Sequence, residues 1–588
     1  MQGWSERLFA CAGRETLIKS IAQAIPTFSM SCFLLTKKVC KSLTSNMARY
    51  WWSSSIDNRS LHWMSWKKLA SPKCSGGMGF RDLHLFNLAL LGKQGWRLLT
   101  SPDSLCARVL KGRYFPDSDF MQASAPKRSS ATWRAIISGR EALLTGLIKR
   151  VGDGSSIAVW DDRWIPSTTT MAPLFRPPNT NISWVSDLID TENWTWRRQL
   201  VRDTFISPDA EAILNIPLRS GGGDDFLAWT HETSGNYTVK SAYRALMIRN
   251  ERQALEEGTD TRSSIDNQRL WNGLWKLNVM PKVKVFFWRV LRGIPPDECT
   301  LKHRHLRRIR LCKICMAMDE DMEHALLIYS HARQFWDEAQ QLFDFHMPRL
   351  HPDTWARDII CDDSFTSRDQ AIIVSVMWSV WHSRNKLAHG EDTLDPAFSV
   401  RRTRETLSLL EIPRSHAILL PGHGWRPPDM EFVKINTDAA IRREDGKGDG
   451  GGVARSASSF QGAWNKPYPG VTDPLIAETM AVGDGVIFAK LRDFSKVVLE
   501  TDCLEVVNLW AARHDSRSIV APILVEIEEL AGTFTSFVFQ HVSRSANGPA
   551  HICAKHACTI DGTESWLDNT PSFLISSLLA DCSANAFV

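Results

Sequence analysis

The stretch EFVKINTDAA, residues 431–440, decides the fold of the C-terminal part of the chain, because it predicts a β-strand that ends near an acidic residue. After a glycine-rich turn, two more strand segments follow, GGVARSAS (451–458) and GAWNKPYP (462–469). The helix DPLIAETMAVGDGVIFAKLRD (473–493) and the strand KVVLETDC (496–503) come next. The order of these segments predicts a sheet that begins with three consecutive strands.

The remaining segments of this region continue the alternation of helices and strands. They are the helices LEVVNLWAARH (504–514) and IVAPILVEIEELAGT (519–533), the strand TSFVFQHVS (535–543) and the helix PAHICAKHAC (549–558). Three strands followed by alternating helices and strands predict an α/β fold, in which a mixed five-stranded sheet is covered on its faces by helices.

Three acidic residues lie where such a fold brings chain segments together. Asp438 ends the first strand, Asp502 ends the fourth, and Glu478 lies near the start of the first helix, whose N-cap and first position we assign to Asp473 and Pro474. Converging carboxylates repel one another unless they bind a hard dication such as Mg²⁺. Two such ions about 4 Å apart would activate a water and stabilise a departing 3′ oxygen. The alternative is that these three are ordinary surface charges among 65 acidic residues.

The motifs VKINTDAA, IAETMAV, LETDC and FQHVSRSANGPAHICAKHA resemble the type 1 ribonuclease H domains of plant LINE-type retroelements, over residues 431–558. The resemblance implies an Mg²⁺-dependent domain that cleaves the RNA strand of an RNA/DNA hybrid, with metal ligands Asp438, Glu478 and Asp502. It also implies that His541 moves protons or assists product release, and that Asn547 contacts the substrate backbone.

Position 551 departs from the wider family, because His551 stands where a fourth aspartate is expected, although plant relatives often share this feature. A neutral imidazole suits Mg²⁺ less well than a carboxylate does, so the second metal would be weakly held and catalysis slow or absent. Alternatively, His551 is a helix residue that faces solvent. Three hypotheses therefore stay open: a hybrid-cleaving enzyme, a nucleic-acid-binding remnant that no longer cuts, and an inert product.

A second motif lies upstream, where Cys312 and Cys315 precede His324 with the spacing of a zinc knuckle. Its setting, with YTVKSAYR before it and EHAL and ARQFW after it, resembles the zinc-binding domain of reverse transcriptases from the same retroelements. The resemblance places a fourth ligand at position 329, which is Tyr329, a poor zinc ligand. His331 is near enough in sequence to replace it. The alternative is a CxxC pair left in a helical module that binds no Zn²⁺.

The N-terminal third, including AGRETLIKSIAQAIPTFSMSCFLL and HWMSWKKLASPKCSGGMGFRDLHLF, resembles the segment that follows the polymerase palm in these elements. Polymerisation needs two adjacent aspartates after Phe or Tyr and one more residue, and no such motif occurs. The pairs Asp161-Asp162 and Asp362-Asp363 lack that context. We expect the palm and fingers to be missing before Met1, and we expect no reverse transcriptase activity.

The composition excludes a globally basic nucleic-acid binder. The chain has 588 residues, 43% hydrophobic, with a formal net charge of +5, so any basic surface is local, as in KHRHLRRIR (302–310) or around Arg401, Arg402 and Arg404. Each run is equally well explained as a solvated helix face. No signal peptide or membrane span is evident, and the 13 cysteines form no short-spaced framework. We expect an intracellular protein, with the nucleus favoured by a retroelement origin.

The whole chain is predicted to be multidomain, with mainly α N-terminal and middle regions. We expect strand pairs at IAVWDDRWIP (157–166) and a hairpin around Ser234-Gly235-Asn236. The predicted parts are a mostly helical post-palm remnant at 1–170, a poorly specified connector at 171–224, a zinc-binding-like domain at 225–340, a helical segment at 341–410, a linker at 411–430, the ribonuclease H-like domain at 431–558, and a tail at 559–588.

Overall fold

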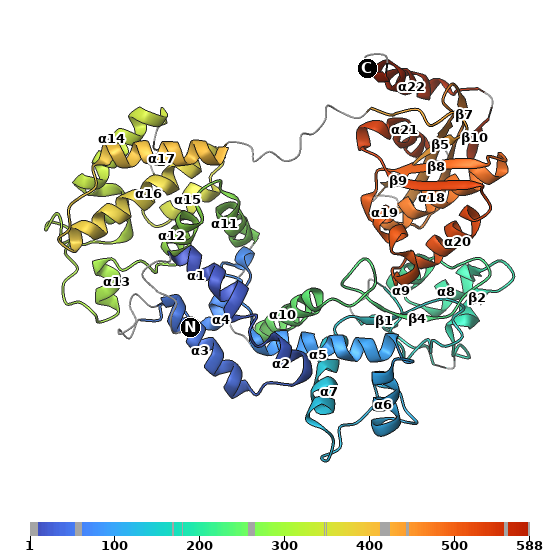
Figure 1. Ribbon diagram of the computed structural model, residues 1–588, viewed down its shortest axis with the longest axis horizontal. Helices are drawn as coiled ribbons and strands as arrows, with labels where there is room; N and C mark the ends of the chain where they lie inside the picture. The colour runs from blue at the N-terminus through green and yellow to red at the C-terminus, as the bar shows by residue number, and fades with distance from the viewer. Residues whose placement is uncertain are drawn as a thin grey trace. The chain divides into compact units, whose positions relative to one another are not determined.

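The computed structural model describes residues 10–52, 61–166, 170–178, 180–256, 265–345, 347, 350–411, 424–442, 446–557, 562–567 and 569–585 (Figure 1). Most of the predicted linker at 411–430, residues 443–445 of the glycine-rich turn after the first C-terminal strand, and Cys558 lie outside these residues. The chain divides into two compact units, Met1–Leu90 with Arg249–Ala417, and Leu91–Ile248 with Ile418–Val588. Among the described helices, none is both long enough and apolar enough to cross a membrane.

The first unit is helical in its described residues, as the sequence predicts for the middle of the chain. Its helices are α1 (Cys11–Leu17), α2 (Thr27–Cys32), α3 (Lys37–Trp52), α4 (Trp66–Ala70), α11 (Ile265–Lys276), α12 (Pro281–Leu291), α13 (Glu298–His303), α14 (Ser330–Phe343), α15 (Trp355–Cys361), α16 (Ser367–Ala388) and α17 (Pro396–Glu411). Two further helices, α5 (Leu83–Thr100) and α10 (Val239–Glu256), contribute residues to both units.

The glycine turn near residue 76 anchors the core of this unit. Gly76 has a φ of +79°, which only glycine adopts without strain, and its carbonyl accepts a 3.0 Å hydrogen bond from Trp288 Nε1 and a 3.1 Å bond from Arg292 Nε. Trp51, Trp288 and Phe335 are fully or almost fully buried. Most of the abundant tryptophan therefore serves packing, as expected for large apolar rings.

The first part of the second unit corrects two strand predictions. It contains α6 (Leu105–Tyr114), α7 (Ala131–Leu143), β1 (Leu147–Arg150), β2 (Ile189–Asp190), β3 (Thr195–Trp196), α8 (Arg198–Thr204), α9 (Ser207–Leu214) and β4 (Phe226–Trp229). The hairpin predicted around Gly235 is wrong, because β4 pairs antiparallel with the distant strand β1. The strand pair predicted at 157–166 is also wrong, since only an isolated bridge from Ala158 to Trp184 forms there.

The segment predicted as a poorly specified connector, 171–224, has a core of its own. Val185, Trp196 and Ile213 are buried and pack with Trp164 and Ile165 of the preceding segment. Trp196 Nε1 donates to the carbonyl of Ile216 at 2.8 Å. Short pieces of helical spacing are present, as in Val201 with Phe205 and Ala210 with Ile213, but spacing within such short elements does not show that they share one core.

The C-terminal α/β domain has the predicted order of strands and helices, with one strand more than expected. Its elements are β5 (Val433–Arg442), β6 (Lys447–Arg455), β7 (Phe460–Pro469), α18 (Pro474–Leu491), β8 (Lys496–Thr501), α19 (Leu504–Ala511), α20 (Ala521–Ala531), β9 (Ser536–His541), α21 (Gly548–Ala557), β10 (Glu564–Trp566) and α22 (Ser572–Asn585). The sheet order is β10-β7-β6-β5-β8-β9. The strands β5, β6, β7 and β10 pair antiparallel, whereas β8 and β9 run parallel to β5.

The prediction of five strands is therefore wrong by one edge strand, β10, which lies in the predicted tail. A three-residue strand is too short to show a two-residue period. The tail 559–588 also contributes α22, where Leu574 is fully buried and Asp581 Oδ2 contacts Arg455 Nη1 at 2.6 Å. The tail thus completes the domain.

Helices α18 and α21 cover opposite faces of the sheet. A Cβ at Gly451 would meet the backbone of Ala554 in α21 at 2.5 Å, whereas one at Gly452 would meet Trp464, which stacks on Phe488 of α18. Consecutive strand residues point to opposite faces, so the glycines of β6 let α21 approach one face and Trp464 lie flat on the other.

Candidate metal centres

The sheet brings three acidic side chains together at one edge. Asp438 lies in β5, Asp502 directly follows β8, and Glu478 lies in the second turn of α18. Strands β5 and β8 are parallel and pair Thr437 with Thr501, so the next residues, Asp438 and Asp502, lie side by side. Asp502 follows the end of β8, but the prediction that Asp438 ends its strand is wrong, because β5 continues to Arg442 and pairs Asp438 with Gly451 of β6. Each of the three carboxylates offers an oxygen within 4.8 Å of the others. The sequence prediction placed these acids at the same edge.

The electrostatics of this acidic cluster favour a bound cation. Burial, and then Asp438 and Asp502, raise the pKa of Glu478 to about 9. Burial raises the pKa of Asp438 to about 6, with its hydrogen bond to His551 acting in the opposite direction. Glu478 Oε2 is buried and has no hydrogen-bond partner among the described residues. A buried carboxylate oxygen without a donor, beside two further carboxylates, fits a hard divalent cation.

His551 contacts the acidic cluster, so it is not a residue that only faces solvent. Its Nδ1 lies 2.6 Å from Asp438 Oδ2, and its side chain is 30% exposed. When Nδ1 carries the proton it donates to Asp438, and Nε2 remains as an acceptor. The imidazole of His551, which belongs to α21, therefore lies within hydrogen-bond distance of one carboxylate oxygen of Asp438.

Asn547 is buried beside the acidic cluster, whereas His541 is exposed at the end of β9. Asn547 is 1% exposed, and its Nδ2 donates to the carbonyl of Thr437 at 3.0 Å and to Asp502 Oδ1 at 3.3 Å. It holds two of the converging strands in place. His541 ends β9 opposite Thr501 and is exposed, and the structure shows no contact between its ring and the carboxylates within the described residues. Its role in catalysis stays a prediction.

A buried polar network below the acidic cluster was missed in the sequence. Glu500 in β8 is 3% exposed, receives a 2.9 Å hydrogen bond from Asn436 Nδ2, and lies 2.9 Å from Lys434 Nζ. Gln540 of β9 donates to the same carboxylate at 2.9 Å. The network fixes the register of three neighbouring strands. The signal was present, because Lys434, Asn436 and Asp438 alternate with small or apolar residues along β5.

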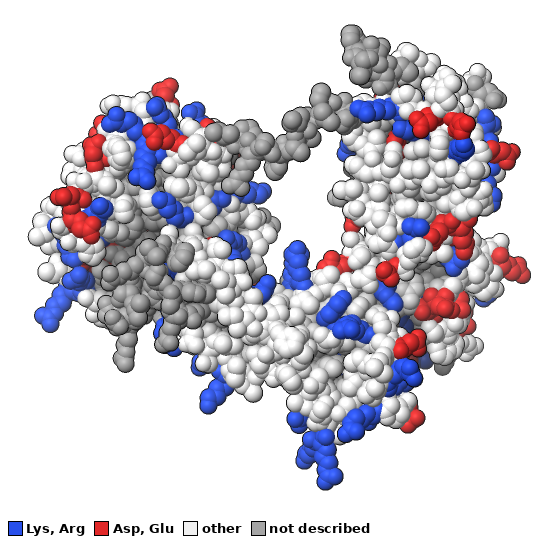
Figure 2. Space-filling view, viewed as in Figure 1, with Lys and Arg blue, Asp and Glu red and all other residues white. Residues whose placement is uncertain are grey.

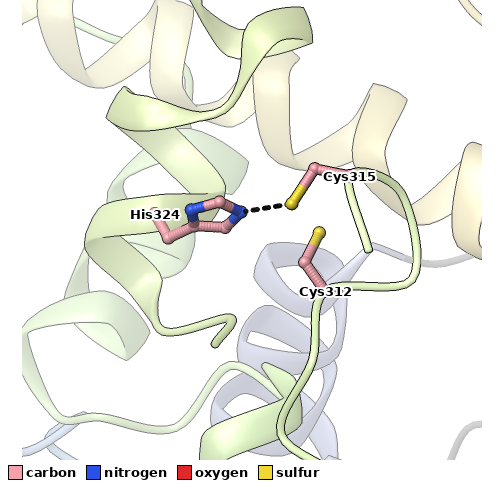
Figure 3. A group of neighbouring side chains, drawn as sticks. All are labelled: Cys312, Cys315 and His324. Atoms are coloured by element: carbon pink, nitrogen blue, oxygen red, sulfur yellow. Dashed lines mark hydrogen bonds between the residues drawn. The ribbon is translucent and has the colours of Figure 1, made fainter. Parts of the chain in front are cut away.

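A second cluster forms in the first unit, where Cys312, Cys315 and His324 point toward one another (Figure 3). Their ligand atoms lie within 4.8 Å of one another, and Cys315 Sγ is 3.4 Å from His324 Nε2. Burial raises the pKa of the Cys312 thiol to about 11, whereas backbone N–H groups lower that of Cys315. Two thiols and an imidazole are the donors that zinc prefers, so this set fits three ligands of a tetrahedral site.

The fourth ligand of this Cys/His cluster is not supplied by the residue that the sequence suggested. His331 Nε2 lies 2.8 Å from Ser383 Oγ, and His331 is outside the group of potential ligands in the described chain. Tyr329 is 3% exposed, its hydroxyl has no hydrogen-bond partner among the described residues, and its ring centroid lies 5.9 Å from that of His324. Burial raises the pKa of Tyr329 above its usual value, which disfavours a phenolate ligand in the metal-free protein.

The two Asp-Asp pairs serve local structure. Asp162 Oδ2 contacts Lys149 Nζ at 2.8 Å and accepts from the backbone N–H of Ala158. Asp363 forms an ion pair with Arg269, and Asp362 accepts from the backbone N–H of Ser364. These contacts give neither pair the setting of a polymerase centre.

Known proteins resemble the chain in both regions. A family described as reverse transcriptase-like matches residues 436–557, and one described as zinc-binding in reverse transcriptase matches residues 237–336. An Arabidopsis thaliana protein named as a candidate ribonuclease H protein, At1g65750, is 29% identical over 552 residues, which are 86% of this chain and 83% of that protein. The uncharacterised mitochondrial protein AtMg00310 of the same plant is 49% identical over 152 residues, which are 26% of this chain and 99% of that protein. The crystal structure of ribonuclease H1 from the halophilic archaeon Halobacterium salinarum is 22% identical and covers 22% of this chain and 98% of its own, with a TM-score of 0.21.

Proposed function

Because this chain belongs to the family of retroelement-type proteins, known from plants, that join a reverse-transcriptase zinc-binding domain to a ribonuclease H-like domain, we propose that its C-terminal domain hydrolyses the RNA strand of RNA/DNA hybrids in an Mg²⁺-dependent reaction. The single observation that carries the proposal is the meeting of Asp438, Glu478 and Asp502 within 4.8 Å. One hard dication, or two, would satisfy these carboxylates better than any arrangement of water.

The residues of the chain have distinct roles in this proposal. Asp438, Glu478 and Asp502 hold the metal, which when bound supplies Lewis-acid activation of a water and neutralises charge on the phosphodiester. Asn547 positions Asp502 through the 3.3 Å hydrogen bond from its amide. His551 holds one oxygen of Asp438, Oδ2, at 2.6 Å and so orients this carboxylate. His541, exposed at the end of β9, gives or receives a proton at the reacting phosphate.

The test uses the full chain with a fluorescently labelled RNA/DNA hybrid in Mg²⁺. We expect cleavage of the RNA strand that is abolished by Asp438→Asn and by chelation of the metal. The matched control is Asp429→Asn, the same substitution at an exposed position before β5. Cleavage that survives Asp438→Asn refutes the assignment, as does equal loss of activity in the control.

A second candidate function, binding of hybrid without cleavage, is favoured by one observation. His551 occupies an oxygen of Asp438 at 2.6 Å where a fourth acidic ligand would otherwise stand, which weakens a second metal position. The cleavage assay separates the two functions when a gel-shift measurement on the same hybrid accompanies it. Binding by the wild-type chain at Mg²⁺ concentrations that give no cleavage supports the second candidate.

The Cys/His cluster supports a separate proposal, a structural Zn²⁺ held by Cys312, Cys315 and His324 with water or a further group as fourth ligand. Metal analysis of the purified chain tests it. We expect close to one zinc per chain, lost in Cys312→Ser, with Cys299→Ser as the control because Cys299 lies outside the group of ligands. Equal zinc content in both variants contradicts the proposal.

A further inference from the structure

A cleft in the first unit has the composition of a nucleotide site, and nothing in the proposed function uses it. Its volume is about 560 Å³, and it lies among the C-terminal end of α11, the end of α14, the first turns of α16 and the last turns of α17. We propose that this cleft binds a nucleotide unit of single-stranded nucleic acid, with cations of the chain on its phosphates and its base against the apolar floor. This site is distinct from the acidic cluster of the C-terminal domain.

The phosphate part of the proposed ligand is inferred from three cationic side chains at the rim of the cleft. Lys276, Arg368 and Arg404 line it, are exposed, and form no salt bridge in the described part of the chain. One carboxylate, Glu411, opposes them. The helix ends around the cleft partly offset one another, because the N-terminus of α16 meets the C-termini of α11 and α17. The positive sign therefore comes from the side chains, and it favours an anionic ligand.

The base of the proposed ligand is inferred from the floor of the cleft, whose buried side chains are apolar. Leu277, Phe343, Ile372 and Leu407 line the cleft and are each at most 9% exposed. Free phosphate or sulfate would leave the apolar floor exposed to water, whereas a ligand with a flat apolar part would cover it. Pockets for small organic groups have volumes of about 300–1,000 Å³, so the cleft is large enough for one base with its sugar and phosphate.

Nucleic acid fits better than an acidic peptide. Acidic side chains project one at a time on flexible stems, whereas a single strand presents a phosphate and a base in a fixed repeat, which matches cations at a rim above an apolar floor. Single-stranded RNA leaves its bases free to enter the cleft, whereas a duplex does not. Figure 2 shows Lys and Arg interspersed with Asp and Glu on the face in view. The proposed ligand would therefore be held by the three cations of the cleft and not by a broad basic surface.

Fluorescence anisotropy of the full chain with a fluorescein-labelled single-stranded RNA of mixed sequence, in a buffer without Mg²⁺, measures the proposed binding without any cleavage. In the triple variant Lys276→Gln, Arg368→Gln, Arg404→Gln, we expect at least a tenfold loss of affinity. We also expect the slope of log affinity against log salt to flatten by about 0.7 to 1.4, because one nucleotide unit is flanked by at most two phosphates and each lost phosphate contact on a single strand removes about 0.7.

A second variant tests the floor. Ser408 lines the cleft and is exposed on α17, so Ser408→Leu adds bulk there, removes no cation and adds no aromatic ring on which a base could stack. We expect at least a fivefold loss of affinity with an unchanged salt slope. Competition with adenosine monophosphate and with inorganic phosphate separates the two halves of the ligand. We expect the nucleotide to displace the RNA at concentrations where phosphate does not.

The matched control removes three exposed cations of the same unit that lie neither in the cleft nor in the basic runs of the sequence, in Lys37→Gln, Lys41→Gln, Arg333→Gln. Far-ultraviolet circular dichroism shows whether each variant is folded. The proposal is overturned if the control loses as much affinity as the cleft variant, if Ser408→Leu binds like the wild type, or if a poly-glutamate peptide competes better than adenosine monophosphate. Because the assay contains no Mg²⁺ and no hybrid, absence of ribonuclease activity does not affect its outcome.

Discussion

Replacing Glu478 by glutamine should stabilise the metal-free protein at neutral pH. The folded state holds the pKa of this carboxyl at about 9, against an ordinary value of 4.5. At pH 7 the unfolded chain therefore releases a proton that the folded chain keeps. Each pKa unit corresponds to about 1.4 kcal/mol, so the interval from 4.5 to 7 costs the fold about 3 kcal/mol, and relaxation of the site reduces this to roughly 1–3 kcal/mol.

The sign of the effect follows from the raised pKa. Below about pH 4.5 the Glu478 carboxyl is protonated in both the folded and the unfolded state, so it does not lower the free energy of unfolding. As the pH rises from 4.5 toward 9, the loss of folding stability grows. Glutamine is neutral throughout, so the difference between Glu478→Gln and the wild type should vanish near pH 4.5 and increase at higher pH. Mg²⁺ should reverse the order, because only the wild type keeps all three carboxylates.

Native-state hydrogen exchange, followed in peptides from β5 and β8, is the suitable assay in a chain with several domains, because it reports the opening free energy of this sheet alone. We expect greater protection in Glu478→Gln at pH 7.5 in EDTA, and greater protection in the wild type after Mg²⁺ is added. The reasoning is refuted if the variant is less protected in EDTA at pH 7.5, or if Mg²⁺ protects both proteins equally.

Three further predictions concern single positions. Gly483→Ala should raise the stability of the C-terminal domain by up to about 1 kcal/mol, since its nearest new contact is 3.7 Å away, whereas Gly485→Ala should lower it because its Cβ would lie 2.8 Å from Thr437. Native-state hydrogen exchange in peptides of α18 and β5 compares the two variants, and equal effects contradict the packing argument. His551→Asp should increase hybrid cleavage at limiting Mg²⁺ by restoring a carboxylate ligand, and a lower rate at every Mg²⁺ concentration would count against a metal role for this position. Tyr329→Cys should tighten zinc binding at least tenfold in a chelator competition, and unchanged affinity would show that the fourth position of the Cys/His cluster is not at residue 329.

Much of the C-terminal fold could be predicted because its signals are local. The segments of β5, β8 and α18 each carry their own period, Asp502 directly follows a strand, and Glu478 lies near the start of a helix, so the meeting of these two acids with Asp438 followed from element order. Their role as metal ligands stays a prediction. The extension of β5 beyond Asp438 was not predicted. The pairing of β4 with β1 could not be predicted, because nothing within either strand encodes a partner almost 80 residues away.

The sequence also could not predict which groups the histidines His551 and His331 contact. Whether His551 faced solvent or Asp438 depended on the rotation of α21 over the sheet, which is set by the close approach of Ala554 to Gly451. Similarly, His331 lies two residues from the position expected for a zinc ligand, but the start of α14 directs its ring to Ser383. Such orientations arise from packing between distant segments.

The position of α22 determines where a stable fragment can end. The family match stops at residue 557, yet Arg455 in the middle of the sheet contacts Asp581 at 2.6 Å, and Leu574 is fully buried. A premature stop codon just after Ala557 would leave every acid of the site in place but strip a counter-ion from a buried guanidinium and uncover the edge strand β7. Shortened alleles of this kind should be lost to proteolysis in the cell, even though their coding sequence still carries the complete motif.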